Sequence, residues 1–128
     1  MAGQATATGF DFARLKQALE RSDAAALADL YAEAAEMTII DRNRPPGAPM
    51  RLVGRPAISA FWQDVCARDM THAVGDEVIG PDRAAFVERC AYPDGCHVVS
   101  AMTLDLRDGR IIRHLTVQAW DEVSCSTG

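Results

Sequence analysis

The strongest constraint on the fold is a change in hydrophobic periodicity at Thr71. From that point the apolar and polar residues alternate with a period of two, which is typical of half-buried strands. Four such runs are present, at about 71–79, 84–92, 96–106 and 110–121. Turn sequences separate them, and Asp-Gly between alternating runs is a strong hairpin signal. The second half of the chain is therefore predicted to be an antiparallel meander.

The last two predicted strands are unusually long for a chain of 128 residues. At about 3.3 Å per residue, each would extend over roughly 35 Å. Strands of that length coil strongly because each one twists. The pattern favours a cone-shaped half-barrel over a flat sheet.

The residues before Thr71 show helical spacing instead. A first helix is predicted over 10–20, and a second begins at Ser22 or Asp23 and runs through Tyr31 or Glu33. Residues 37–40 form a β-branched strand with a returning segment at 51–53, and Gly54-Arg55-Pro56 opens a third helix. The apolar stripe of that helix is the clearest in the chain and consists of Ile58, Phe61, Trp62, Val65 and Cys66.

These elements predict one α+β domain over 10–121, in which a curved antiparallel sheet packs against three N-terminal helices. Residues 1–9 are predicted to be a disordered tail, and 122–128 a C-terminal tail. The net charge of −5 and the lack of a Lys/Arg cluster argue against a nucleic-acid partner. No apolar run approaches the roughly 20 residues of a membrane span.

The N-terminus lacks the features of a secretory signal, so a cytoplasmic location is expected. Cys90 and Cys96 flank one predicted turn, but the predicted pairing does not place them opposite each other. We therefore expect no disulfide between them.

Three segments carry a resemblance to a known family. They are Leu-Ala-Asp-Leu-Tyr-Ala-Glu-Ala-Ala, Gly-Arg-Pro-Ala-Ile-x-x-Phe-Trp, and Leu-Arg-Asp-Gly-Arg-Ile before a final strand that ends in Asp. Together they resemble the SnoaL-like branch of the nuclear transport factor two superfamily, over about 10–121. That superfamily includes ketosteroid isomerases, polyketide cyclases, epoxide hydrolases, dehydratases and non-catalytic modules, so the fold alone does not select a function.

Alternation indicates which side chains line the cone. On 96–106 the set with Val98 and Met102 faces the helices. On the last strand apolarity alone favours the set with Ile111, Leu115 and Val117 as core. The resemblance instead implies that the other set faces the cone, namely Ile112, His114, Thr116, Gln118 and Trp120.

The set with Ile111, Leu115 and Val117 would then pack against a second subunit, which predicts a homodimer through the sheet. His72 is expected to point inward with Val74 and Val78. For 84–92 the choice between the Phe86 set and the Arg89 set stays open.

The resemblance implies three possible enzyme activities, and each requires particular catalytic residues at particular positions. A ketosteroid isomerase would use a base such as Asp41, but its oxyanion donors fall near Leu15 and Met102, which cannot donate. An epoxide hydrolase would use Arg89, but its two aspartate positions hold Ala91 and Thr116. A polyketide cyclase pairs an aspartate base with a histidine, and His72, His114 and Asp41 could supply these groups. Asp121 stands either at the rim or as a simple end to the last strand.

The leading hypothesis is an enzyme without metal or other cofactor that isomerises, cyclises or dehydrates a hydrophobic, carbonyl-bearing small molecule by proton transfer. His114 and His72 would form the acid–base pair, and Asp41 would be an orienting or basic carboxylate. The predicted ligand contacts are Gln118, Trp120, Tyr31, Trp62, Met102, Phe86 and Thr116. The alternative is a non-catalytic module that binds a ligand or dimerises. A zinc site would require His72 and His114 to meet beside a carboxylate.

Overall fold

The computed structural model describes residues 9–121, and the two predicted tails lie outside it apart from Gly9. The helices within these residues are α2 (Phe12–Glu20), α3 (Ala24–Ala28) and α4 (Arg55–Cys66). The strands are β1 (Tyr31–Ile40), β2 (Met50–Val53), β3 (Thr71–Ile79), β4 (Arg83–Ala91), β5 (His97–Arg107) and β6 (Arg110–Trp120). The α+β class and the four-strand meander after Thr71 are thus confirmed.

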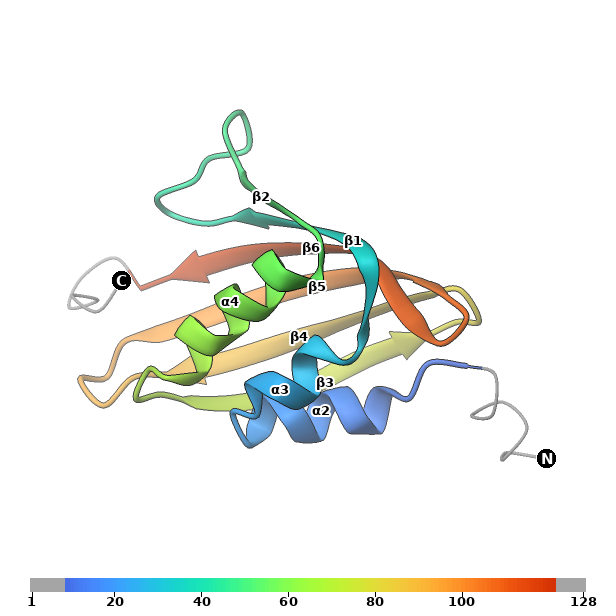
Figure 1. Cartoon of the computed structure of the whole chain (residues 1–128). Coiled ribbons are helices and arrows are strands. Elements are labelled where there is room, and N and C mark those ends of the chain that lie inside the picture. Colours follow the sequence, from blue (N-terminus) through green and yellow to red (C-terminus); the bar gives the residue numbers. More distant parts are fainter. Residues whose placement is uncertain (1–8, 122–128) are drawn as a thin grey trace.

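The strands form one open sheet in the order β2-β1-β6-β5-β4-β3 (Figure 1). Every pairing is antiparallel except that of β1 with β6, which is parallel. The sheet is therefore mixed: the predicted antiparallel meander is present, and β1 adds one parallel pairing that the sequence did not predict. Alternation along a strand indicates which face is buried, but not which strand from the other half of the chain will pair with it.

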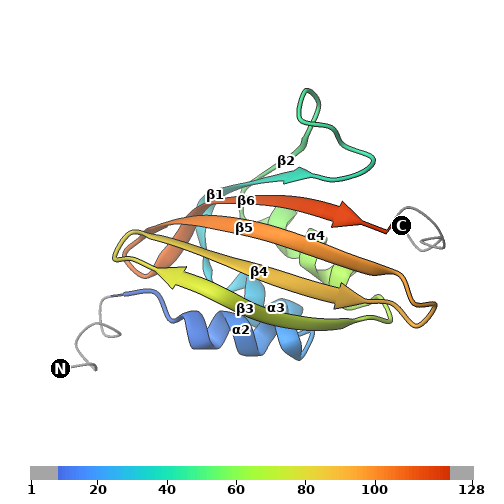
Figure 2. The same cartoon turned by 180° about the vertical axis from the view of Figure 1, so that it is seen from behind.

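All three helices lie on one face of the sheet, as Figure 1 shows, and none of the described helices covers the face seen in Figure 2. The main apolar core lies between them and includes Leu15, Leu19, Ile58, Leu104 and Ile111. None of the described helices has the length and apolarity needed to cross a membrane.

The first two helices begin at aspartates that accept a backbone N–H bond. Asp11 accepts from Arg14 at 3.2 Å, and Asp23 accepts from Ala26 at 3.1 Å. The helix that starts after Asp23 is only five residues long. The prediction that it extends through Tyr31 was therefore wrong. Tyr31 instead begins β1, where it pairs with Ile111 of β6. Pairing with a distant strand overrides the helical tendency of the alanine-rich segment.

Two irregularities in the sheet change which side chains are buried. Between Gly75 and Val78 the register of β3 against β4 shifts, and Asp76 adopts a positive φ of 55°. Val78 is consequently exposed, which corrects the prediction that it points inward with His72 and Val74.

A second shift separates Asp105 from Leu106 on β5, opposite 111–113 of β6. Because of this register shift the side chain of Ile111 points into the core, whereas those of Leu115 and Val117 lie on the outer face as predicted. The expectation that Ile111 belongs to the outer set was therefore wrong. Cys90 is a free thiol, so the expected absence of a Cys90–Cys96 disulfide is confirmed.

Candidate functional site

A cavity of about 210 Å³ opens between the concave face of the sheet, helix α4 and the segment after β1. Apolar side chains supply much of its wall, including Met37, Ile39, Val65, Val98 and Met102. Typical pockets for drug-sized ligands measure roughly 300–1,000 Å³, so this cavity suits a compact molecule.

The polar centre of the cavity is a histidine bonded to a carboxylate. The Nδ1 of His72, on β3, lies 2.6 Å from Oε2 of Glu88, on β4, and both side chains are almost fully buried. Because a carboxylate accepts, this contact assigns the proton to Nδ1. In the neutral ring this leaves the lone pair on His72 Nε2, an atom with no hydrogen-bond partner within residues 9–121. A carboxylate that fixes the tautomer of an imidazole is the arrangement of a general base.

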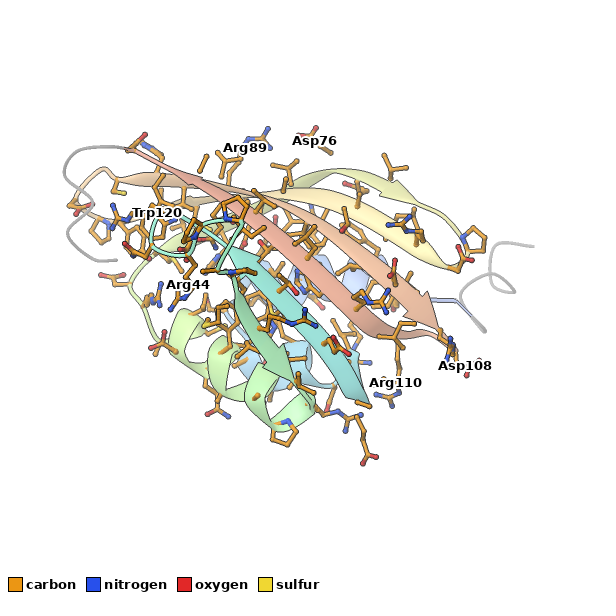
Figure 3. All side chains as sticks on the ribbon, turned by 90° about the horizontal axis from the view of Figure 1, so that it is seen from above. Arg44, Asp76, Arg89, Asp108, Arg110 and Trp120 are labelled. Carbon is orange, nitrogen blue, oxygen red and sulfur yellow. The ribbon has the colours of Figure 1, made fainter. Side chains whose placement is uncertain are left out.

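Glu88 reaches the cavity because β4 turns the set containing Phe86, Glu88 and Cys90 inward. This settles the parity of 84–92 that the sequence left open. Arg89 points to the opposite face, where it forms an ion pair with Asp76 at 3.1 Å, away from the helices (Figure 3). The arginine that matched an epoxide hydrolase is thus remote from the cavity.

Cys90 completes a group of three possible metal ligands. One donor atom each from His72, Glu88 and Cys90 lies within 4.8 Å of the other two. Nitrogen, oxygen and sulfur donors together suit Zn²⁺. Two ligands about 2 Å from one zinc would sit roughly 3 Å apart, however, so the 2.6 Å contact is a hydrogen bond as it stands. Burial raises the pKa of the Cys90 thiol, which keeps it protonated and a poor nucleophile. His72 and His114 do not meet in such a group among the described residues.

His114 lies in a separate buried chain of hydrogen bonds. Trp62 donates from Nε1 to the Tyr31 hydroxyl at 3.1 Å, and that hydroxyl lies 2.7 Å from Nδ1 of His114. Since Trp62 can only donate, the tyrosine proton is left for His114 Nδ1. Burial lowers the pKa of His114 to about 3, so the ring is neutral at physiological pH.

Further polar groups stand on the floor of the cavity. Thr116, on β6 opposite Met102, has a buried hydroxyl that finds no partner elsewhere in the described chain. Gln118 follows on the same face and accepts from Nε1 of Trp120 at 3.1 Å through its oxygen. That bond orients the amide of Gln118, whose nitrogen can donate to a ligand.

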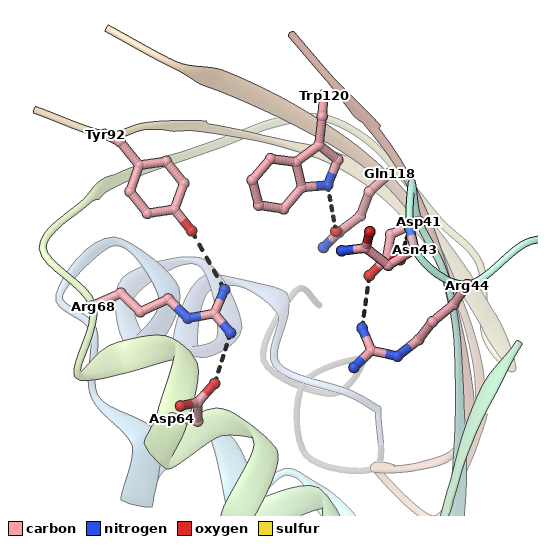
Figure 4. Close-up of polar contacts among 8 residues, drawn as sticks. All are labelled: Asp41, Asn43, Arg44, Asp64, Arg68, Tyr92, Gln118 and Trp120. Carbon is pink, nitrogen blue, oxygen red and sulfur yellow. Dashed lines mark hydrogen bonds and ion pairs between the residues drawn. The ribbon is translucent and has the colours of Figure 1, made fainter. Parts of the chain in front are cut away.

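The mouth of the cavity carries two arginines from different elements (Figure 4). Arg44 donates to Asp41 Oδ2 at 2.9 Å, and Asp41 Oδ1 also accepts from the backbone of Asn43 at 2.9 Å. On the other side, Arg68 donates to Asp64 at 2.7 Å and to the Tyr92 hydroxyl at 3.3 Å.

The predicted site residues divide into two groups. Those that line the cavity are His72, Asp41, Gln118, Trp120, Trp62, Met102 and Thr116. Those outside its lining are His114, Tyr31 and Phe86, which are buried in the core; Phe86 packs edge-on against Phe12. The fold therefore does not place His114 beside His72 and Asp41.

Sequence reasoning missed Glu88, Cys90, Arg68 and Tyr92. The available signal for Glu88 was a charged residue in an otherwise apolar strand with a histidine on the neighbouring strand. Asp121 accepts from the backbone of His97 at 2.8 Å and is exposed, which fits a residue that ends the last strand.

A half-open cone of strands closed by three helices around a small cavity defines the class of folds related to nuclear transport factor 2. An NTF2-like protein of unknown function from Mesorhizobium loti is 22% identical, with a TM-score of 0.76 over 91% of this chain and 92% of that chain. A protein from Kribbella flavida is 21% identical, with a TM-score of 0.72 over 94% of this chain and 80% of its own. At this level of identity the likeness shows the fold alone.

Within that class, the model of the SnoaL-like domain family matches residues 12–114, and the chain belongs to this family. A steroid delta-isomerase from Pseudomonas aeruginosa shares the fold at 18% identity, with a TM-score of 0.67 over 90% of this chain and 79% of that chain. None of the curated proteins matches the sequence.

Proposed function

We propose that the protein catalyses a cofactor-independent proton transfer on a compact, hydrophobic, carbonyl-bearing substrate, with His72 as the base and Glu88 as its orienting carboxylate. The observation that carries the proposal is the 2.6 Å contact between the two side chains in the wall of the cavity. A buried pair of this kind is poised for proton transfer, because the carboxylate stabilises the imidazolium that forms.

In the proposed step, the proton on the carbon next to the substrate carbonyl moves to Nε2 of His72. The electron pair of the C–H bond becomes the enolate, and the negative charge falls on the carbonyl oxygen. The Thr116 hydroxyl and the Gln118 amide line the same cavity and would donate to that oxygen. Return of the proton from His72 to another carbon gives isomerisation. Attack of the enolate carbon on a second carbonyl forms a C–C bond and an alkoxide, and the alkoxide takes the proton from His72 to complete a cyclisation.

The expected partnership of His114 with His72 is revised in this proposal. His114 stands outside the lining of the cavity and is bonded to Tyr31, so we assign it a positioning role through Tyr31 and Trp62. Trp62 lines the cavity, and its orientation depends on that chain. Asp41 uses both carboxylate oxygens in the mouth and is assigned to orienting Arg44 rather than to proton transfer.

The proposal includes a homodimer through the outer face of the sheet. Val99 of β5 and Leu115 and Val117 of β6 are exposed there. They lie on two paired strands, with Ala101 opposite Val117. A contiguous apolar face of this kind is typical of an interface.

The test uses 5-nitrobenzisoxazole, a compact two-ring compound whose ring opens when a base removes one C–H proton. We expect slow turnover by the wild type and a fall in kcat/KM of about 100-fold or more in His72→Ala. Glu88→Gln should lower kcat with KM little changed, since it disturbs the imidazole and not the apolar wall. The control is His97→Ala, at an exposed histidine that forms no part of the cavity lining.

Equal turnover by His72→Ala and the wild type would refute the assignment of the base. If no variant or wild-type protein turns the probe over while all bind it, the alternative of a non-catalytic binding module is favoured. In that case His72→Ala changes affinity only.

A further inference from the structure

The mouth of the cavity has a chemistry that the proton-transfer dyad does not explain. Arg44, in the segment after β1, and Arg68, just beyond α4, both belong to the lining. Figure 4 shows their guanidinium groups directed toward the space between these two segments. Two cations from separate elements therefore flank the entrance of a cavity whose lining mixes apolar and polar side chains.

Each arginine retains hydrogen-bonding capacity. A guanidinium offers five N–H donors in a planar fork. The described contacts use one donor of Arg44, to Asp41, and two of Arg68, to Asp64 and Tyr92. Asp64 is exposed, and an ion pair to an exposed carboxylate contributes little. A ligand carboxylate could therefore share or replace that contact at small cost.

Flat aromatic surfaces stand beside the two arginines. The rings of Tyr92 and Trp120 are stacked, with centroids 6.0 Å apart and an interplanar angle of 26°. The guanidinium carbon of Arg42 lies 4.3 Å from the centroid of the Trp120 ring. These contacts occupy faces of the Trp120 ring, so the apolar surface left for a ligand is supplied by the ring edges together with Phe61 and Val65 of the lining. An apolar ligand body can pack there, with an anionic end held by the bidentate donors of arginine.

The interior fixes the orientation of such a ligand. The Glu88 carboxylate lies buried beside His72, and a second carboxylate next to it would be repelled and desolvated. The charged end of an acid must therefore stay at the mouth while its uncharged part enters. The volume of about 210 Å³ limits that part to one or two rings.

We propose that Arg44 and Arg68 bind the carboxylate of a compact aromatic or polyunsaturated acid whose apolar body occupies the cavity. This inference deepens the proposed function, since the reacting carbon would face His72, and it rests on that function for the identity of the cavity as a substrate site. It does not require that any turnover be detected.

The test compares 2-naphthoate with 2-naphthamide, which has the same ring system without the charge. Isothermal titration of the wild type should give at least 10-fold tighter binding of the acid. Arg44→Gln and Arg68→Gln should each weaken the acid about 5- to 30-fold and leave the amide unchanged, and Arg44→Lys should recover part of the loss. The matched control is Arg51→Gln, at an exposed arginine of β2 that pairs with Glu36 outside the cavity. Circular dichroism verifies that each variant is folded.

Equal affinity for acid and amide overturns the proposal, and so does a loss in the arginine variants that is the same for both compounds. Failure of the wild type to bind either compound also overturns it. The 5-nitrobenzisoxazole assay uses an uncharged probe and the His72 variant, so it succeeds or fails independently of this result. Binding that discriminates the charge, without any turnover, would support the arginine site and refute only the catalytic role.

Discussion

Because His114 is buried, the free energy of unfolding is predicted to depend on pH in a specific way. In the folded chain the pKa of His114 is lowered to about 3 because the ring is fully removed from water, against 6.5 for the free side chain. Between these two values the unfolded chain binds a proton that the folded chain excludes. The unfolded state is therefore favoured progressively as the pH falls below 6.5, and stability is regained as the pH rises through the same range.

The magnitude follows from the two pKa values. Each pH unit in that window changes the free energy of unfolding by about 1.4 kcal/mol for one proton. Between pH 7 and pH 5 the contribution of His114 is a loss of about 2 kcal/mol. That loss is a large fraction of the 5–15 kcal/mol that is typical for a whole domain.

The assay is urea unfolding of the wild type and His114→Gln at pH 7 and pH 5, followed by tryptophan fluorescence. Glutamine retains a polar group toward Tyr31 but does not titrate. The wild type should lose about 2 kcal/mol more than the variant over this interval, because all other groups cancel in the comparison. His97→Gln, at an exposed histidine, should follow the wild type closely. Parallel losses in the wild type and His114→Gln would show that His114 does not resist protonation, and the reasoning from burial would be refuted.

Three further predictions follow from named contacts. Tyr31→Phe removes the hydroxyl that joins Trp62 to His114 and should lower the free energy of unfolding by about 1–3 kcal/mol, measured by the same urea titration; no change would show that the hydrogen bonds are not formed in solution. Val117→Glu places a charge on the outer face and should convert the proposed dimer to a monomer, measured by light scattering. The control Val78→Glu, at a residue of β3 that is 71% exposed, should leave the dimer intact, and a monomeric wild type would contradict the proposed interface. EDTA should leave the His72-dependent turnover unchanged, and its loss, with recovery on adding Zn²⁺, would reassign His72, Glu88 and Cys90 to a metal site.

Much of the architecture was accessible from the sequence because it depends on local signals. The meander follows from period-two alternation and its turns, and α4 follows from Gly54, a proline in its first turn and a clear apolar stripe. The parallel pairing of β1 with β6 depends on contacts between residues about 80 positions apart, which no local pattern encodes. The same pairing converted Tyr31 from a predicted helical residue into the first residue of a strand.

The site was predicted less well, because it depends on which face each side chain occupies. His72, Asp41, Thr116 and Gln118 line the cavity as expected. His114 shares the inward face of β6 with Thr116 and Gln118, but it lies closer to the start of the strand, where Tyr31 and Trp62 cover it. Alternation specifies the face of the sheet and not the depth at which helices fill it.

One inserted residue in β3 decides which charge accompanies His72. Near the turn, Ile79 pairs with Ala84 and Val78 with Ala85. If that register continued along the strand, Val74 would lie opposite Arg89, and His72 would share its face with a cation. The shift between Gly75 and Val78 moves the pairing by one position, so Val74 lies opposite Glu88 and His72 opposite Cys90. Opposite residues of antiparallel strands share a face, so the irregularity replaces arginine by glutamate beside the histidine. The sequence Glu88-Arg89 permits either outcome, and the bulge at Asp76 selects the one that places a hydrogen-bond acceptor beside Nδ1 of His72.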